Sequence, residues 1–170
     1  MSVLRRAVYI EILKHLKLAG VDYGKSISRS LGIPLADVLA ALEELAAMGF
    51  VELVDRPTLK NTVAKMKRSH EVRKHHKYYR LSKAGEALLR CLRRRGAELY
   101  LEALTEEERR ALAAICRGDA AEGEALEALT AMGLVTNGEL TELGLKVAAK
   151  INPSCMQSYI SRRLKKPPRE

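Results

Sequence analysis

The chain has 170 residues, of which 47% are hydrophobic and only 4% are aromatic. This composition predicts a packed core, excludes a wholly disordered chain, and disfavours a single-strand binder that stacks bases on aromatic side chains. The 30 Lys and Arg residues against 21 Asp and Glu give a net charge of +9, which favours a polyanionic partner.

Three helices are predicted at the start of the chain. Apolar residues at helical spacing predict the first helix from Val3 to Leu18, before Gly20. Asp22 is expected to cap a short second helix over about 23–31. A third helix over about 35–48 is expected to bury the apolar residues Leu35, Val38, Leu39, Leu42 and Leu45.

A long basic wing is predicted after these helices. An alternating segment at 50–54 is expected to pair with a second strand at 78–81, and Ser82 would then cap a helix through about residue 95. Residues 56–80, the basic wing, hold 9 Lys and Arg against 1 Glu, a net charge of +8. Three helices, a hairpin and a closing helix form the winged helix-turn-helix pattern.

An internal repeat is predicted from two similar segments. Residues 41–51 match residues 125–135 at eight of 11 positions, and each segment is followed by Leu-Ser/Thr-x-x-Gly. In the second copy, Thr105 opens a capping box and Asn137-Gly138 is typical of a tight hairpin. We therefore expect a mainly α protein with small β-hairpin wings, in which a winged helix-turn-helix is followed by a degenerate winged-helix repeat.

Three regions are predicted along the chain. The first, residues 1–96, is the winged helix-turn-helix that carries the basic wing. The second, residues 97–152, is the degenerate winged-helix-like unit, and it is acidic because residues 97–144 hold 11 acidic against 3 basic side chains. The third, residues 153–170, is expected to be a C-terminal helix with a basic tail.

Two motifs resemble known families. The segments Leu-x-x-Leu-x-x-Met-Gly-Phe-Val at 42–51 and Tyr-Arg-Leu-Ser-Lys-Ala-Gly at 79–85 resemble winged-helix regulators of the MarR-like kind. A closer resemblance is to an uncharacterised archaeal winged-helix family, a domain-of-unknown-function family, carried by residues 15–17, 22–27, 64–67 and 71–79. This resemblance implies a winged-helix fold and implies no established activity.

Nucleic acid is the predicted partner of the basic side chains. Cations of the wing and polar groups of the second helix would contact phosphates, which set affinity and register without reading bases. The candidate nucleic-acid-binding residues are Lys25, Ser26, Ser28, Arg29, Lys60, Lys65, Lys67, Arg68, Arg73, Lys74, His75, His76, Lys77 and Arg80. We expect a transcriptional regulator that binds DNA.

Two alternatives to a DNA-binding regulator stay open. The third helix has no Arg, Lys, Asn, Gln, Ser or Thr between Pro34 and Gly49, so it lacks the side chains that usually read base edges. Binding to structured RNA, including the ribosome, needs shape and phosphate contacts rather than such side chains. A protein-interaction scaffold is the other alternative. An apolar stripe near residues 88–101 predicts either packing between the two halves or a homodimer.

Catalysis, cofactors and metals have little support in the sequence. No catalytic motif is found, so we expect no enzyme and no cofactor. Glu71 and the histidines at 70, 75 and 76 lack the spacing and the number of ligands typical of zinc sites. The three scattered cysteines indicate reduced thiols. With no apolar run of 18 residues and no signal peptide, we expect a cytoplasmic protein without a membrane partner.

Overall fold

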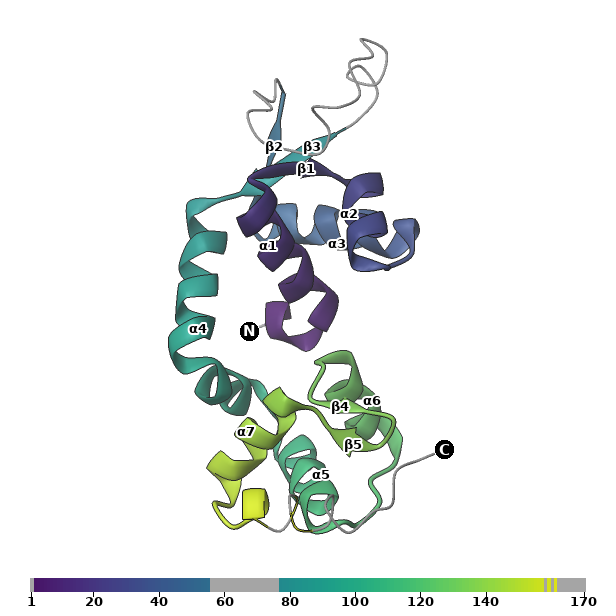
Figure 1. Ribbon diagram of the computed structural model, residues 1–170, viewed down its shortest axis with the longest axis vertical. Coiled ribbons are helices and arrows are strands. Elements are labelled where there is room, and N and C mark those ends of the chain that lie inside the picture. The colour runs from purple at the N-terminus through teal and green to yellow at the C-terminus, as the bar shows by residue number, and fades with distance from the viewer. Residues whose placement is uncertain (1, 56–76, 158, 160, 162–170) are drawn as a thin grey trace. The chain divides into compact units, whose positions relative to one another are not determined.

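The computed structural model of the chain describes residues 2–55, 77–157, 159 and 161. It is mainly helical with small antiparallel sheets, as predicted (Figure 1). The chain divides into two compact units. We call Val8–Arg93 the 8–93 unit, and Met1–Ala7 together with Arg94–Glu170 the terminal unit.

The 8–93 unit combines helices with a three-stranded sheet. The sheet has the order β1-β3-β2, and both strand pairs are antiparallel. Its helices and strands are α1 (Ala7–Ala19), β1 (Val21–Tyr23), α2 (Gly24–Leu31), α3 (Leu35–Ala47), β2 (Val51–Val54), β3 (Tyr78–Leu81) and the first part of α4 (Lys83–Ala103). The predicted hairpin is confirmed, and β1 adds a strand that the sequence analysis did not predict.

The core of the 8–93 unit forms because α1 and α3 each carry an apolar stripe. On α3 the fully buried residues are Val38, Ala41, Leu42 and Leu45, which is the i, i+3, i+4, i+7 spacing of one helix face. Ile27 of α2 is also completely buried. Burial of each large side chain contributes about 1.5–3 kcal/mol, so the core holds the helices in place and leaves the opposite faces to solvent.

Three local predictions for the first 47 residues are wrong. The first predicted helix is two elements, a 3-10 helix η1 (Ser2–Arg5) and α1, which begins at Ala7. Leu35 and Leu39 are 41% and 43% exposed, because the buried stripe of α3 runs through Ala41 instead. Asp22 does not cap α2: the cap residue is Tyr23, without a side-chain capping hydrogen bond, and Asp22 lies in β1.

The terminal unit packs η1 with the C-terminal elements. Its remaining elements are the end of α4, α5 (Glu106–Arg117), α6 (Gly123–Ala131), β4 (Val135–Thr136), β5 (Glu139–Leu140) and α7 (Glu142–Ile151). The predicted capping box is confirmed, since Thr105 and Glu108 exchange side-chain hydrogen bonds with each other's backbone N–H groups. The predicted Asn137-Gly138 hairpin is also confirmed, with both residues at positive φ.

The strand-to-helix junctions of the two units have the same hydrogen bonds. The Ser82 hydroxyl donates to the Gly49 carbonyl at 2.6 Å and accepts from the Gly85 N–H at 3.1 Å. In the terminal unit, the Thr141 hydroxyl donates to the Gly133 carbonyl at 2.8 Å and accepts from the Gly144 N–H at 3.0 Å. The confirmed N-cap of α4 by Ser82 thus has a close counterpart at α7.

Two cysteines are paired, contrary to the prediction of reduced thiols. Cys116 of α5 and Cys155 form a disulfide with a Cα–Cα distance of 5.7 Å, which is ordinary for a disulfide. Both residues are buried, whereas Cys91 is a free, exposed cysteine. The sequence separation of 39 residues concealed the pairing, because only tertiary packing brings the two side chains together.

Among the described residues, no helix combines the length and the apolar character that crossing a bilayer requires.

Candidate nucleic-acid interface

The 8–93 unit contains all of the predicted nucleic-acid-binding residues. Six of them are described by the structure: Lys25, Ser26, Ser28, Arg29, Lys77 and Arg80. The other eight lie outside the described residues: Lys60, Lys65, Lys67, Arg68, Arg73, Lys74, His75 and His76.

Helix α2 exposes two of the predicted cations. Lys25 and Arg29 are both exposed and, four positions apart, they lie on the same helix face. Neither forms an ion pair with any residue that the structure describes. The two serines are half-buried, and the Ser28 hydroxyl donates to the Ile33 carbonyl at 2.7 Å. Ser28 therefore stabilises the turn after α2, and the free positive charge of this helix comes from Lys25 and Arg29.

The wing begins where β2 and β3 separate. Val54 pairs with Tyr78 at the last register position, so residues 55–77 connect the two strands at this end of the hairpin. Lys77, the residue before β3, is exposed and has no ion pair within the described part of the chain. Arg80 differs, because its guanidinium binds Glu52 on the opposing strand, with N–O distances of 2.9 and 3.0 Å. The charge of Arg80 is already compensated in the folded protein.

A partly buried histidine–aspartate pair joins α1 to β1. His15 Nε2 lies 2.8 Å from Asp22 Oδ2, and Asp22 Oδ1 accepts from the Tyr23 N–H at 2.9 Å. Next to this pair, the rings of Tyr23 and Tyr78 contact edge to face, with centroids 5.7 Å apart. These contacts hold β1 between the first two helices and against β3. This pair was not predicted from the sequence, where Asp22 between Val21 and Tyr23, shortly after Gly20, is the available signal.

The exposed face of α3 carries no cation. Leu35 and Leu39 are joined there by small and acidic residues, all exposed: Ala36, Asp37, Ala40, Glu43, Glu44 and Ala47. Leu39 packs over the start of α2, since a Cβ atom at Gly24 would come within 2.6 Å of its Cδ2. Burial, and then the carboxylate of Glu43, raise the pKa of Tyr79 on β3. The negative charge of α3 therefore acts on β3, one of the two strands that flank the basic wing.

The arrangement suits phosphate binding better than base recognition. Lys25, Arg29 and Lys77 are exposed cations that form no ion pair with a described residue, whereas the exposed face of α3 offers methyl groups and carboxylates. Across the described residues, no three His, Cys, Asp or Glu side chains gather where they could hold a metal ion. The histidines of the wing, at 70, 75 and 76, lie outside the described residues.

Comparison with known proteins gives one match. The family described as an uncharacterised protein conserved in archaea (DUF2250) matches residues 1–92, which is more than half of the chain. No curated protein and no solved structure shows significant similarity to the chain.

Proposed function

Because the chain belongs to this archaeal family, whose description names no activity, we propose its function from its own residues: a non-enzymatic winged-helix protein that binds nucleic acid. DNA is the favoured partner and transcriptional regulation the favoured role. The basic wing contacts phosphates, and Lys25 and Arg29 of α2 add contacts beside it.

The winged-helix assignment is supported by the order of elements in the 8–93 unit. Helices α1 to α3, the β2–β3 hairpin and α4 follow one another as that fold requires. The matching hydrogen bonds of Ser82 and Thr141 support a repeat of the same hairpin-to-helix junction in the terminal unit.

One observation carries the proposal: a net charge of +8 is concentrated in residues 56–80. The flanking strands β2 and β3 are paired, so this segment begins and ends at one edge of a small, well-packed unit. Cations that bind phosphates release condensed counterions, and this release makes the affinity strongly dependent on salt. If about six cations reach phosphates, the log–log salt slope should be near −5.

The mode of binding follows from α3. A helix that enters the major groove normally presents Arg, Asn, Gln or Ser to base edges. The exposed face of α3 presents Leu35, Leu39 and carboxylates instead. We therefore expect high affinity with little sequence preference, and discrimination through the shape of the nucleic acid.

The first test uses fluorescence anisotropy with duplex DNA and with structured RNA, at several salt concentrations. Replacing Lys65, Lys67, Arg68, Arg73 and Lys74 with glutamine should abolish tight binding and flatten the salt slope by about 1 for each phosphate that is no longer bound. Unchanged affinity for both nucleic acids would overturn the proposal. Circular dichroism of the variant shows whether the protein remains folded.

A second test uses described residues with a matched control. Lys25→Gln with Arg29→Gln should weaken binding to all duplexes alike, since both side chains are exposed and unpaired among the described residues. Lys14→Gln with Arg90→Gln removes the same charge from the same unit, but these cations pair with Glu11 and Glu86. Equal weakening by the two double variants would show that only net charge matters and that α2 makes no direct contact.

Structured RNA is the first alternative partner, because the cation-free face of α3 fits shape recognition. A protein scaffold is the second, because Leu35 and Leu39 are exposed. The variant Glu43→Gln distinguishes RNA binding from a protein scaffold. Loss of this carboxylate should strengthen binding to any phosphate backbone that lies near α3, and it should leave binding of a protein partner unaffected. A homodimer through the apolar stripe near residues 88–101 stays a prediction, tested by sedimentation.

A further inference from the structure

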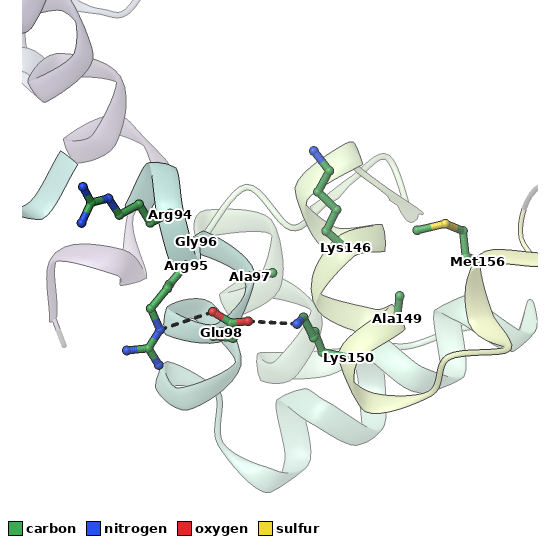
Figure 2. A pocket seen from close by; sticks show the side chains of 9 residues that line it. All are labelled: Arg94, Arg95, Gly96, Ala97, Glu98, Lys146, Ala149, Lys150 and Met156. Carbon is green, nitrogen blue, oxygen red and sulfur yellow. Dashed lines mark hydrogen bonds and ion pairs between the residues drawn. The ribbon is translucent and has the colours of Figure 1, made fainter. Parts of the chain in front are cut away.

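A cleft in the terminal unit has the features of an anion site. It has a volume of about 420 Å³ and lies between the part of α4 that follows its interruption and helix α7 (Figure 2). The interruption is at Arg95, whose backbone is not helical (φ −134°, ψ 29°). Four cations line the cleft, Arg94 and Arg95 from α4 and Lys146 and Lys150 from α7, and Glu98 is the one acidic side chain in the lining.

Glu98 acts as an internal counterion of this cleft. Its carboxylate lies between two of the cations, 3.4 Å from Arg95 Nε and 2.9 Å from Lys150 Nζ (Figure 2). The hydrogen bond from Lys150, followed by its charge, lowers the pKa of Glu98. Glu98 is therefore ionised at neutral pH, and with Glu102 and Glu142, which pair with Arg95 and Lys146, three carboxylates face the four cations of the cleft. A net positive charge of one remains.

The other charge pairs around the cleft are exposed. Arg95 lies 3.4 Å from Glu102, and Lys146 lies 2.6 Å from Glu142, which is on the solvent side of α7. Arg94 has no ion pair with any described residue, and its side chain points away from Glu98 (Figure 2). Exposed pairs are weak and screened by salt. A ligand that offers several negative charges at once can exchange with them.

Charge number decides which anions can bind. A monoanion would only take the place of Glu98 in its ion pairs with Arg95 and Lys150, so it gains little binding free energy. A multivalent anion can also interact with the cations that Glu98 does not neutralise. The remaining lining is apolar, with Ala97 and Ala149 on the two helices and the side chain of Met156, which is 39% exposed. This surface can cover an organic group. We propose that the cleft binds a small organic polyphosphate, such as a nucleoside diphosphate or triphosphate.

This proposal is independent of the proposed function. The cleft belongs to the terminal unit, whereas the described nucleic-acid-binding residues belong to the 8–93 unit. Isothermal titration calorimetry of the full chain with ATP, AMP, adenosine and inorganic pyrophosphate tests it directly. ATP should bind with a stoichiometry of one, AMP more weakly, and adenosine not at all. Pyrophosphate should bind more weakly than ATP, because it has no organic group for the apolar surface to cover, and equal affinity would overturn the assignment of an organic ligand.

Two sets of variants make the test sharp. Arg95→Gln and Lys150→Gln should each weaken ATP binding about tenfold, because each removes a charge-assisted hydrogen bond. Glu98→Gln should strengthen it about threefold, because the competing carboxylate is gone. The matched controls are Arg117→Gln and Glu127→Gln, which change the net charge equally in the same unit but do not line the cleft.

Three results would overturn the proposal. The first is that neither ATP nor pyrophosphate binds to the folded chain. The second is that the controls change affinity as much as the cleft variants do, so that binding follows net charge alone. The third is that Arg95→Gln and Lys150→Gln weaken binding of duplex DNA or RNA while ATP does not bind, which would make the cleft part of a nucleic-acid surface.

Discussion

Both carboxylate oxygens of Glu108 accept hydrogen bonds from one nitrogen of Arg5, each at 2.7 Å, although the two residues are 103 positions apart in the chain. Glu108 is only 5% exposed. It also accepts from the Thr105 N–H at 2.8 Å. A single carboxylate thus caps α5 and fixes η1 to the C-terminal half of the chain.

Removing Arg5 should therefore destabilise the terminal unit. In Arg5→Ala, the buried carboxylate of Glu108 keeps its hydrogen bond from the Thr105 N–H and loses those from Arg5. We expect a loss of about 2 kcal/mol in the free energy of unfolding. Urea unfolding at neutral pH measures this loss. Arg110→Ala is the control in the same unit, since the Arg110 side chain is 76% exposed and its ion pair is with the exposed Glu106. A loss there as large as at Arg5 would contradict the role given to the pair.

The same carboxylate should make stability fall in acid. Burial alone would raise the pKa of Glu108, but the hydrogen bonds from Arg5 and Thr105 outweigh it and the pKa lies below its ordinary value. The stabilisation is therefore complete above the unfolded pKa of about 4.3 and is lost as the pH falls through the lower folded pKa. The stability difference between the native chain and Glu108→Gln should shrink over this range. A difference independent of pH would show that the charge of Glu108 is irrelevant.

Ser82→Ala and Thr141→Ala should have similar costs. Each change removes a helix N-cap and leaves the carbonyl of Gly49 or Gly133 without its hydroxyl donor, so we expect about 1–2 kcal/mol for each. Thermal unfolding followed by circular dichroism checks both. Ser82→Thr keeps the hydroxyl and should retain most of the stability, whereas an equally large loss would point to packing rather than to the cap.

Gly85→Ala and Gly144→Ala should be more damaging. A Cβ atom at Gly85 would collide with the Phe50 carbonyl oxygen, and one at Gly144 with the Leu134 carbonyl oxygen. Backbone cannot move aside as a side-chain end can, so each variant should lose about 3 kcal/mol or more. Gly96→Ala is the control, because its added Cβ meets no atom within 4 Å among the described residues outside its own helix turn, and a helical alanine should be neutral or stabilising. Melting temperatures of the three variants provide the comparison.

Reducing the Cys116–Cys155 disulfide should destabilise the terminal unit. A closed loop of this length contributes about 3–4 kcal/mol. Dithiothreitol should lower the melting temperature of the native chain and of Cys91→Ser. It should have no effect on Cys155→Ser, which lacks the disulfide already. If the native chain melts at the same temperature with and without reductant, and mass spectrometry shows free thiols in both, the pairing is absent in solution.

Local signals made several features predictable from the sequence. The Thr105 capping box, the Asn137-Gly138 turn and the Ser82 cap depend on residues within a few positions of one another, and the structure confirms each. The basic wing is equally visible in the sequence, because charge concentration needs no knowledge of packing. Its role in nucleic-acid binding stays a prediction.

Features that join distant segments needed the tertiary structure. Helical periodicity placed Leu35 and Leu39 in the core, but both are more than 40% exposed, because the face of α3 that packs inward runs through Val38, Ala41, Leu42 and Leu45. Likewise, nothing near Arg5 in the sequence indicates Glu108, and nothing near Cys116 indicates Cys155. Short-range hydrogen bonds and local charge depend on residues that are neighbours in the sequence. Burial and long-range pairing arise only when packed elements exclude water from a shared core.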